Sequence, residues 1–216
     1  MICWRCKRKF GNRSAQLDLC KPCSEDCHQL TELAQEIEKC TACPLSEGAT
    51  KKVYGRGFWA APILFIGEAP GKKEDEEGFP FVGAAGVILD TLIDYVDLPK
   101  DSYFITNVVC CRPPNNRVPL PAEIKACEPF LKRAITYIKP KIIVTLGATA
   151  TRDVFKIYKG EFTEKPMSEM HGQIQYLNDF KLLPMYHPAA ILYNGTLMDR
   201  VKDDFKLLKI LYRGIK

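Results

Sequence analysis

Short apolar runs alternate with helical patterns along most of the chain. Apolar residues at 30, 33, 34 and 37 follow the spacing of one helix face, which predicts a helix over 28–39. Four apolar runs bounded by turn residues predict strands at 63–66, 103–106, 142–146 and 182–185. Helical patterns at 89–96 and 121–135 separate the first three strands, and a last helix is expected over 199–212. This alternation favours an α/β fold, with a mostly parallel four-stranded sheet and helices on both sides.

The last of these strands is expected to pair with a neighbour in the opposite direction. Segments 173–177 and 180–185 flank Asn178-Asp179, a turn that is typical of a hairpin. Because the predicted elements begin near residue 28 and half of the cysteines precede it, we divide the chain into a short cysteine-rich segment, residues 1–28, and one α/β domain, residues 29–216.

Composition narrows the function classes only slightly. The 216 residues are 46% hydrophobic, which supports a real core, and the net charge of +5 permits a polyanionic partner without requiring one. No apolar stretch approaches the roughly 20 residues that span a bilayer, and the start lacks the apolar core of a secretory signal. We therefore expect a cytoplasmic protein with no membrane partner. Structural disulfides are rare in that compartment, so ten cysteines indicate bound metal.

Two Cys-x2-Cys pairs stand near the N-terminus: Cys3 with Cys6, and Cys20 with Cys23. Two such pairs at short range are typical of a site in which four thiolates hold Zn²⁺. Zinc would stabilise a segment that is too small to build its own core. Cys27 and His28 are spare, and either could replace one of the ligands.

A second set of cysteines is spread over three segments. Cys40 and Cys43 follow the first helix, Cys110 and Cys111 follow the second strand, and Cys127 lies on the next helix. Four thiolates from separate segments suit either zinc or a four-iron cluster, and spacing alone does not choose between them. The alternative is that Cys110 and Cys127 are buried packing residues, which is common for cysteine.

Polar and glycine residues follow each predicted strand. Glu68 opens a turn rich in glycine and acids, residues 67–83, directly after the first strand. Asn107 follows the second strand, Gly147 the third and His187 the last. Ligands of open parallel sheets bind beyond the carboxyl ends of the strands, so we expect these side chains to converge there. Taken alone, the acidic turn would equally suit an ordinary surface loop.

Three motifs then resemble one known family, the family 4 uracil-DNA glycosylases. The motifs are Gly67-Glu68-Ala69-Pro70-Gly71 with Gly78-x-Pro80-Phe81-Val82-Gly83, then Thr106-Asn107-Val108-Val109 with Cys111-Arg112-Pro113-Pro114, and His187-Pro188-Ala189-Ala190. Their order and spacing also agree, and the similarity covers roughly residues 38–213. The first 35 or so residues lie outside it.

This resemblance implies a three-layer α/β/α sandwich and a [4Fe-4S] cluster. By analogy its ligands are Cys40, Cys43, Cys111 and Cys127, and Cys110 stands where the family usually has lysine. The implied activity is DNA repair: hydrolysis of the N-glycosidic bond of deoxyuridine in single- or double-stranded DNA, which leaves an abasic site. We expect a monomer, with any repair or replication partner unknown. The alternatives are a non-catalytic nucleic-acid-binding module and an iron–sulfur redox protein.

A glycosylase of this kind extrudes its base from the helix and must then read, stack and release it. Asn107 offers a donor and an acceptor that match the O4 and N3–H edge of uracil. His187 would hydrogen-bond the negative charge that develops on O2. Glu68 is the candidate to stabilise the cationic sugar and position water, with Glu74 or Asp75 as the second choice. Together with Asn107, the base pocket is expected to include Gly67, Ala69, Glu74 and Phe81, with Phe81 stacking on the base.

Further residues are expected to contact DNA outside the base pocket. Ile191 and Leu192 follow the histidine motif and could fill the gap that a flipped base leaves. Arg112 and Arg117 suit phosphate contacts, although both could instead pack near the cluster.

Overall fold

The computed structural model describes residues 28–159, 163, 165–177 and 179–215. The zinc ligands predicted near the N-terminus lie outside these residues, so the zinc site stays a prediction. Within the described residues, no helix combines the length and apolar character needed to cross a bilayer.

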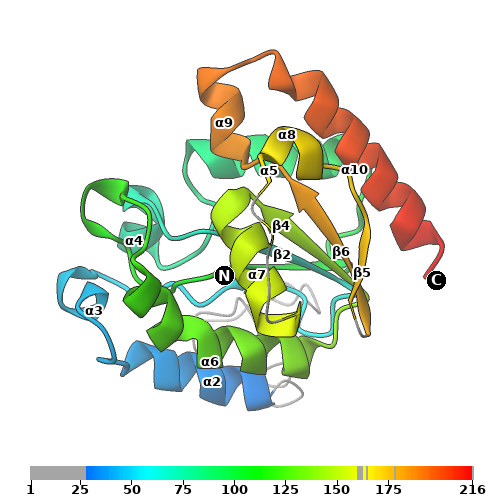
Figure 1. The fold of residues 1–216 in the computed structure, drawn as a ribbon. Coiled ribbons are helices and arrows are strands. Elements are labelled where there is room, and N and C mark those ends of the chain that lie inside the picture. The colour runs from blue at the N-terminus through cyan, green and yellow to red at the C-terminus, as the bar shows by residue number, and fades with distance from the viewer. Residues whose placement is uncertain (1–27, 160–162, 164, 178, 216) are drawn as a thin grey trace, which may run out of the picture.

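One mixed sheet of six strands forms the centre of the molecule (Figure 1). Across the sheet the strands are β1 (Arg56–Gly57), β3 (Tyr103–Asn107), β2 (Ile63–Gly67), β4 (Ile142–Leu146), β6 (Phe180–Met185) and β5 (Gln175–Leu177). β3, β2, β4 and β6 run parallel, while β1 and β5 pair antiparallel at the two edges. The sheet is thus wider than the four strands predicted. β1 escaped prediction because two residues carry no periodic signal.

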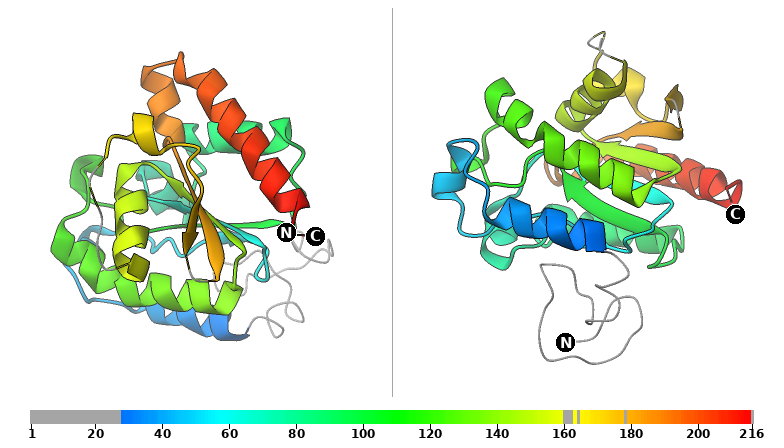
Figure 2. Two further views of the ribbon diagram at one scale, coloured as in Figure 1. Left: turned by 45° about the vertical axis from the view of Figure 1, so that its right-hand side comes forward. Right: turned by 90° about the horizontal axis from the view of Figure 1, so that it is seen from below.

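Helices cover both faces of this sheet, as Figures 1 and 2 show. One layer holds α2 (His28–Glu38), α6 (Pro121–Ile138) and α7 (Ala148–Lys159), and the other holds α5 (Ala84–Tyr95), α9 (Pro188–Tyr193) and α10 (Leu197–Arg213). Short helices complete the described fold: α3 (Leu45–Gly48), α4 (Lys72–Glu77), the 3₁₀ turn η1 (Pro114–Asn116) and α8 (Met167–Met170). α2 and α6 lie side by side below the sheet (Figure 2).

Two separate cores follow from the alternation of side chains along each strand. In β2, Leu64 and Ile66 join the core formed with α2, α6 and α7. Ile63 and Phe65 point to the opposite face and join α5 and α10, where the Phe65 ring stacks on Phe205 with centroids 6.2 Å apart. Since all five residues of β2 are buried, the strand reads as a continuous apolar run.

Five helices of the described residues were not predicted from the sequence: α3, α4, α7, α8 and α9. All of them except α7 have six residues or fewer. α7 was not predicted, because its buried residues include Thr149, Thr151 and Asp153, which break the apolar periodicity. The acidic turn 67–83 contains α4, whose helical acids Glu74 and Asp75 accept backbone hydrogen bonds from other segments. Tertiary contacts of this kind are not visible in the spacing of residues.

The carboxyl ends of the parallel strands meet at one edge. Gly67 pairs in register with Asn107, so the residues that follow β2 and β3 begin side by side. The amide of Gly147, after β4, donates to the carbonyl of Met185 in β6 at 2.8 Å. The chain proceeds from β2 to β3 on one side and then to β4 on the other. This reversal is where open α/β sheets form their ligand crevice.

Candidate active site

A pocket of about 640 Å³ lies at this carboxyl edge. Its lining includes these residues predicted from the sequence: Glu68, Ala69, Glu74, Phe81, Asn107, Arg117 and His187. Gly147, Thr149, Val118 and Tyr193 also line it. The structure therefore brings together the acid, the amide and the imidazole that lie far apart in the sequence.

Asn107 presents a buried polar group to this pocket. Asn107 is only 4% exposed, and its Oδ1 atom has no hydrogen-bond partner among the described residues. A buried acceptor without a partner is costly and requires an explanation, of which a ligand donor is one. Gly67 makes room for this amide, since a Cβ there would stand 2.4 Å from Asn107 Oδ1.

His187 is the N-cap residue of α9, and its hydrogen bond fixes the tautomer. Its Nδ1 atom accepts from the Ala189 amide at 3.1 Å, so the neutral ring carries its proton on Nε2. Burial lowers the pKa of His187 to about 4, although the nearby Glu74 carboxylate acts in the opposite direction. The ring is thus a neutral donor at physiological pH. Gly147, with φ of +93°, allows it to approach, because a Cβ there would lie 3.2 Å from His187 Cβ.

Phe81 forms the wall beside this imidazole. Its ring stacks on His187 with centroids 5.6 Å apart and an interplanar angle of 29°. Its backbone lies in the left-handed region with φ of +54°, which is strained for a residue with a bulky side chain. Surrounding groups must therefore hold this conformation.

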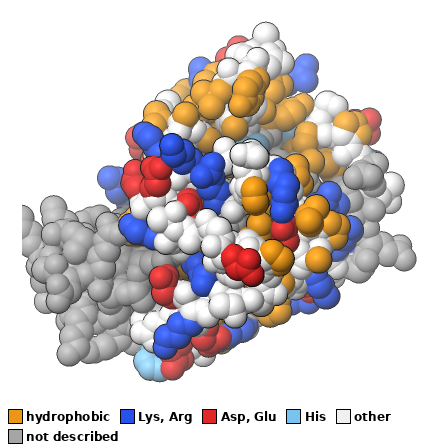
Figure 3. Space-filling view, turned by 90° about the vertical axis from the view of Figure 1, so that its left-hand side faces the viewer, with side chains coloured by type: hydrophobic (Ala, Val, Ile, Leu, Met, Phe, Trp, Pro, Cys, Tyr) orange, Lys and Arg blue, Asp and Glu red, His pale blue; other side chains and the backbone are white. Residues whose placement is uncertain are grey.

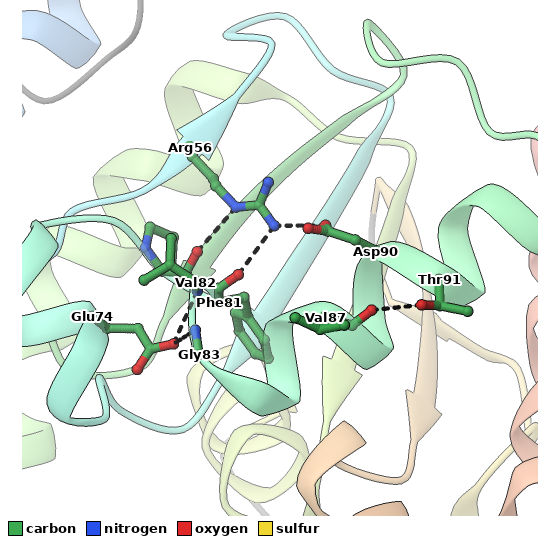
Figure 4. A network of polar contacts seen from close by, with 9 residues as sticks. Arg56, Glu74, Phe81, Val82, Gly83, Val87, Asp90 and Thr91 are labelled. Atoms are coloured by element: carbon green, nitrogen blue, oxygen red, sulfur yellow. Dashed lines mark hydrogen bonds and ion pairs between the residues drawn. The ribbon is translucent and has the colours of Figure 1, made fainter.

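The acids of the loop divide into structural and chemical candidates. Glu74 Oε1 accepts from the amides of Val82 at 2.9 Å and Gly83 at 2.7 Å, at the start of α5 (Figure 4). Asp75 is buried and accepts from the Thr50 amide at 3.0 Å. Both carboxylates hold the loop in shape, whereas Glu68 lines the pocket directly after β2.

Side chains predicted to contact DNA have different surroundings. Ile191 is buried in the core beneath α9, whereas Leu192 and Tyr193 are 54% and 91% exposed. Figure 3 shows hydrophobic side chains gathered on the upper part of one face, above a band of mixed charge. Successive helical residues point in different directions, so Leu192 and Tyr193, rather than Ile191, present apolar surface beside the pocket.

The two predicted arginines form hydrogen bonds within the protein. Arg117 forms a bidentate pair with the buried carboxylate of Glu123, at 2.6 and 2.8 Å. Arg112 donates from Nε to Asn116 Oδ1 at 2.8 Å. Of the two, only Arg117 lines the pocket.

Five free cysteines surround one small cavity: Cys40, Cys43, Cys110, Cys111 and Cys127. A hydrogen bond from Cys110 lowers the pKa of Cys127 to about 7, while burial and nearby thiolates raise the pKa of Cys111 to about 12. The cavity volume is about 10 Å³. Among the described residues, no group of three or more His, Cys, Asp or Glu side chains is arranged to hold a metal ion.

Comparison with known proteins places the chain among close relatives. The profile of the uracil DNA glycosylase superfamily matches residues 54–209. A type-4 uracil-DNA glycosylase of Sulfurisphaera tokodaii is 44% identical over 188 residues, or 84% of each chain. The type-4 uracil-DNA glycosylase of Archaeoglobus fulgidus is 40% identical over 181 residues, which cover 82% of this chain and 90% of that protein. A type-4 uracil-DNA glycosylase of Saccharolobus solfataricus is 44% identical over 182 residues, which cover 82% of this chain and 83% of that protein. The profile match spans every pocket residue named above.

Proposed function

This chain belongs to the uracil DNA glycosylase superfamily, and within it to the type-4 uracil-DNA glycosylases, and we propose that its pocket performs their reaction with Glu68, Asn107 and His187. It is a hydrolase that excises uracil from DNA in repair. The observation that carries the assignment of residues is the buried Oδ1 of Asn107, which has no partner in the part of the chain that the structure describes and lies in a pocket shared with the other two side chains.

Asn107 reads the base edge. Its Oδ1 accepts from uracil N3–H and its amide nitrogen donates to O4, so both groups of the base are satisfied. Cytosine has an acceptor at N3 and a donor at its exocyclic amine, which is the opposite pattern. A fixed amide therefore rejects cytosine by leaving buried polar groups unpaired. Phe81 stacks on the base and adds no preference between pyrimidines.

His187 and Glu68 act on opposite charges of the transition state. As the bond between C1′ and N1 breaks, its electron pair stays with uracil and the sugar becomes cationic. The Nε2–H of neutral His187 donates to uracil O2, where the negative charge gathers. Glu68 stabilises the cationic sugar and accepts the proton of a water whose oxygen bonds to C1′. The products are free uracil and an abasic site.

The activity is tested by incubation with an oligonucleotide that contains one uracil, as a single strand and as a duplex. Alkaline cleavage of the abasic product measures uracil release. Absence of release from both substrates by folded protein would refute the proposed function.

Replacement of Glu68 by glutamine is expected to lower the single-turnover rate by about 10², because the amide neither stabilises the cation nor accepts the proton. The matched control is Glu77→Gln, which changes an exposed acid at the end of α4 and should leave the rate unaltered. Equal rates for Glu68→Gln and the wild type would assign the role to another group.

We propose that the cysteine cavity holds a [4Fe-4S] cluster through Cys40, Cys43, Cys111 and Cys127. In support, these thiols come from three chain segments and surround one cavity. The cavity of about 10 Å³ is water-sized, so the thiol side chains must turn outward to admit the cluster. A bound cluster would tie α2, the segment after β3 and α6 together, and the hydrolysis needs no electrons from it.

Replacement of Cys127 by serine is expected to abolish iron binding and to lower the melting temperature by about 10 °C, because bound metal contributes directly to folding. Iron content, visible absorbance and thermal unfolding measure these effects in anaerobically purified protein. Cys110→Ser is the matched control, since it removes the neighbouring thiol that is not a proposed ligand. If the Cys127→Ser protein keeps its full iron content, or if only the Cys110→Ser control loses iron, Cys110 rather than Cys127 is the cluster ligand.

The N-terminal segment, residues 1–28, is proposed to bind Zn²⁺ through Cys3, Cys6, Cys20 and Cys23, beside a domain of residues 29–216. Support comes only from the spacing of these cysteines. The same metal analysis tests it, with zinc expected in addition to iron.

We propose that Leu192, Arg112 and Arg117 contact DNA. The protein is also proposed to act as a monomer.

A further inference from the structure

The backbone of Phe81 is held from both sides by charged side chains. Arg56, on edge strand β1, donates from Nε to the Pro80 carbonyl at 3.0 Å and from Nη2 to the Phe81 carbonyl at 3.3 Å. On the other side, Glu74 accepts from the next two amides, those of Val82 and Gly83. Figure 4 shows these contacts around the turn. Three successive peptide units are thereby fixed in orientation.

Arg56 is itself anchored. Its Nη2 atom lies 2.7 Å from Asp90 Oδ1 on α5. Neither Arg56 nor Asp90 lines the pocket, although Phe81 and Glu74 do. Gly86 on the same helix admits the Phe81 carbonyl, because a Cβ there would lie 1.9 Å from that oxygen. The guanidinium therefore links β1, the turn and α5 behind the pocket wall.

We propose that Arg56, anchored by Asp90, is a positioning residue that holds Phe81 in its left-handed conformation and so sets the plane of the stacking ring. This inference rests on the proposed function of the pocket. Left-handed backbone at a bulky residue persists only where its surroundings over-determine it. Release of the two carbonyls would let the turn relax and would move the ring relative to His187 and the base.

The experiment measures single-turnover uracil release and the dissociation constant for uracil-containing DNA. Arg56→Ala is expected to lower the rate by about 10-fold or more, since displacement of a pocket wall by about 1 Å is enough for such a loss. The dissociation constant for DNA should stay within about twofold, because Arg56 does not line the pocket. Arg56→Lys keeps the charge but not the planar fork, and it should lose part of the rate.

Arg133→Ala is the matched control, because Arg133 also pairs with one carboxylate, that of Glu36, and its loss removes the same charge on another face. It should leave the rate unaltered. If Arg56 acts through Phe81, Arg56→Ala should cause almost no further loss in a Phe81→Ala background. If Arg56→Ala does not fold, Arg56→Lys and Asp90→Asn carry the same cycle.

Three outcomes overturn this role. The first is an unaltered rate in Arg56→Ala, and the second is a loss that is equally large in the Phe81→Ala background. In both, release by the wild type and by Arg133→Ala leaves the proposed function intact. The third is the absence of release by every protein, which overturns the proposed function and this role with it.

Discussion

Replacement of His187 by alanine is expected to slow uracil release by about 10²–10³, the loss typical of removing one donor to a developing negative charge. The donor is already fixed before the reaction, because the Ala189 amide occupies Nδ1 and leaves the proton on Nε2. The stacked Phe81 ring further holds the imidazole in place. Single-turnover rates with a uracil oligonucleotide measure the effect.

The pH dependence separates a neutral from a charged histidine. With the pKa of His187 lowered to about 4 by burial, the ring stays neutral from pH 5.5 to 8, so the ratio of wild-type to His187→Ala rates should be constant over that range. If the donor were instead a charged imidazolium with a pKa near or above neutrality, this ratio of rates would fall as the pH rises through that pKa.

Stability supplies an independent check on the same group. An unfolded histidine has a pKa near 6.5, so between about pH 6.5 and 4 the unfolded state binds a proton that folded His187 does not. Stability due to this group is present above pH 6.5 and falls as pH falls. Urea unfolding should show a steeper loss for the wild type than for His187→Ala over that interval. The control for both measurements is His28→Ala, which changes an exposed histidine of α2.

Much of the fold could be predicted because its central strands are buried on both faces. Such strands appear as short apolar runs, and their carboxyl ends are marked by the residues that follow them. The register of Gly67 with Asn107 then places Glu68 near that amide, as expected for parallel neighbours. The convergence of acid, amide and imidazole was therefore a consequence of topology.

Other features depend on contacts that sequence spacing does not record. Arg56 lies on a two-residue edge strand, and its partners are backbone carbonyls that become visible only in three dimensions. Glu74 resembled a catalytic acid in the sequence, yet its carboxylate accepts the amides that open α5. The exposure of Leu192 and the burial of Ile191 depend on where α9 begins, which is set by the cap at His187.

Replacement of Asn107 by aspartate is expected to lower uracil release by on the order of 10³ or more, because a site built to hydrogen-bond its substrate tolerates a mismatched edge poorly. An ionised aspartate at this position has no donor for uracil O4. Because native Asn107 is only 4% exposed, water cannot readily take the place of the missing hydrogen bond. The matched control is Gln35→Glu, which adds the same charge at an exposed position of α2, away from the pocket, and should leave the rate nearly unaltered.

The same variant should gain slow release of cytosine, and pH decides how much. Burial raises the pKa of a carboxyl group, so the introduced acid is partly protonated in the pocket. A protonated acid donates to cytosine N3 and accepts from its exocyclic amine, which is the complement that the native amide lacks. Cytosine release should therefore rise as pH falls from 8 to 6, while the wild type shows none. If the variant loses uracil activity but never releases cytosine, Asn107 supports the pocket without reading the base edge.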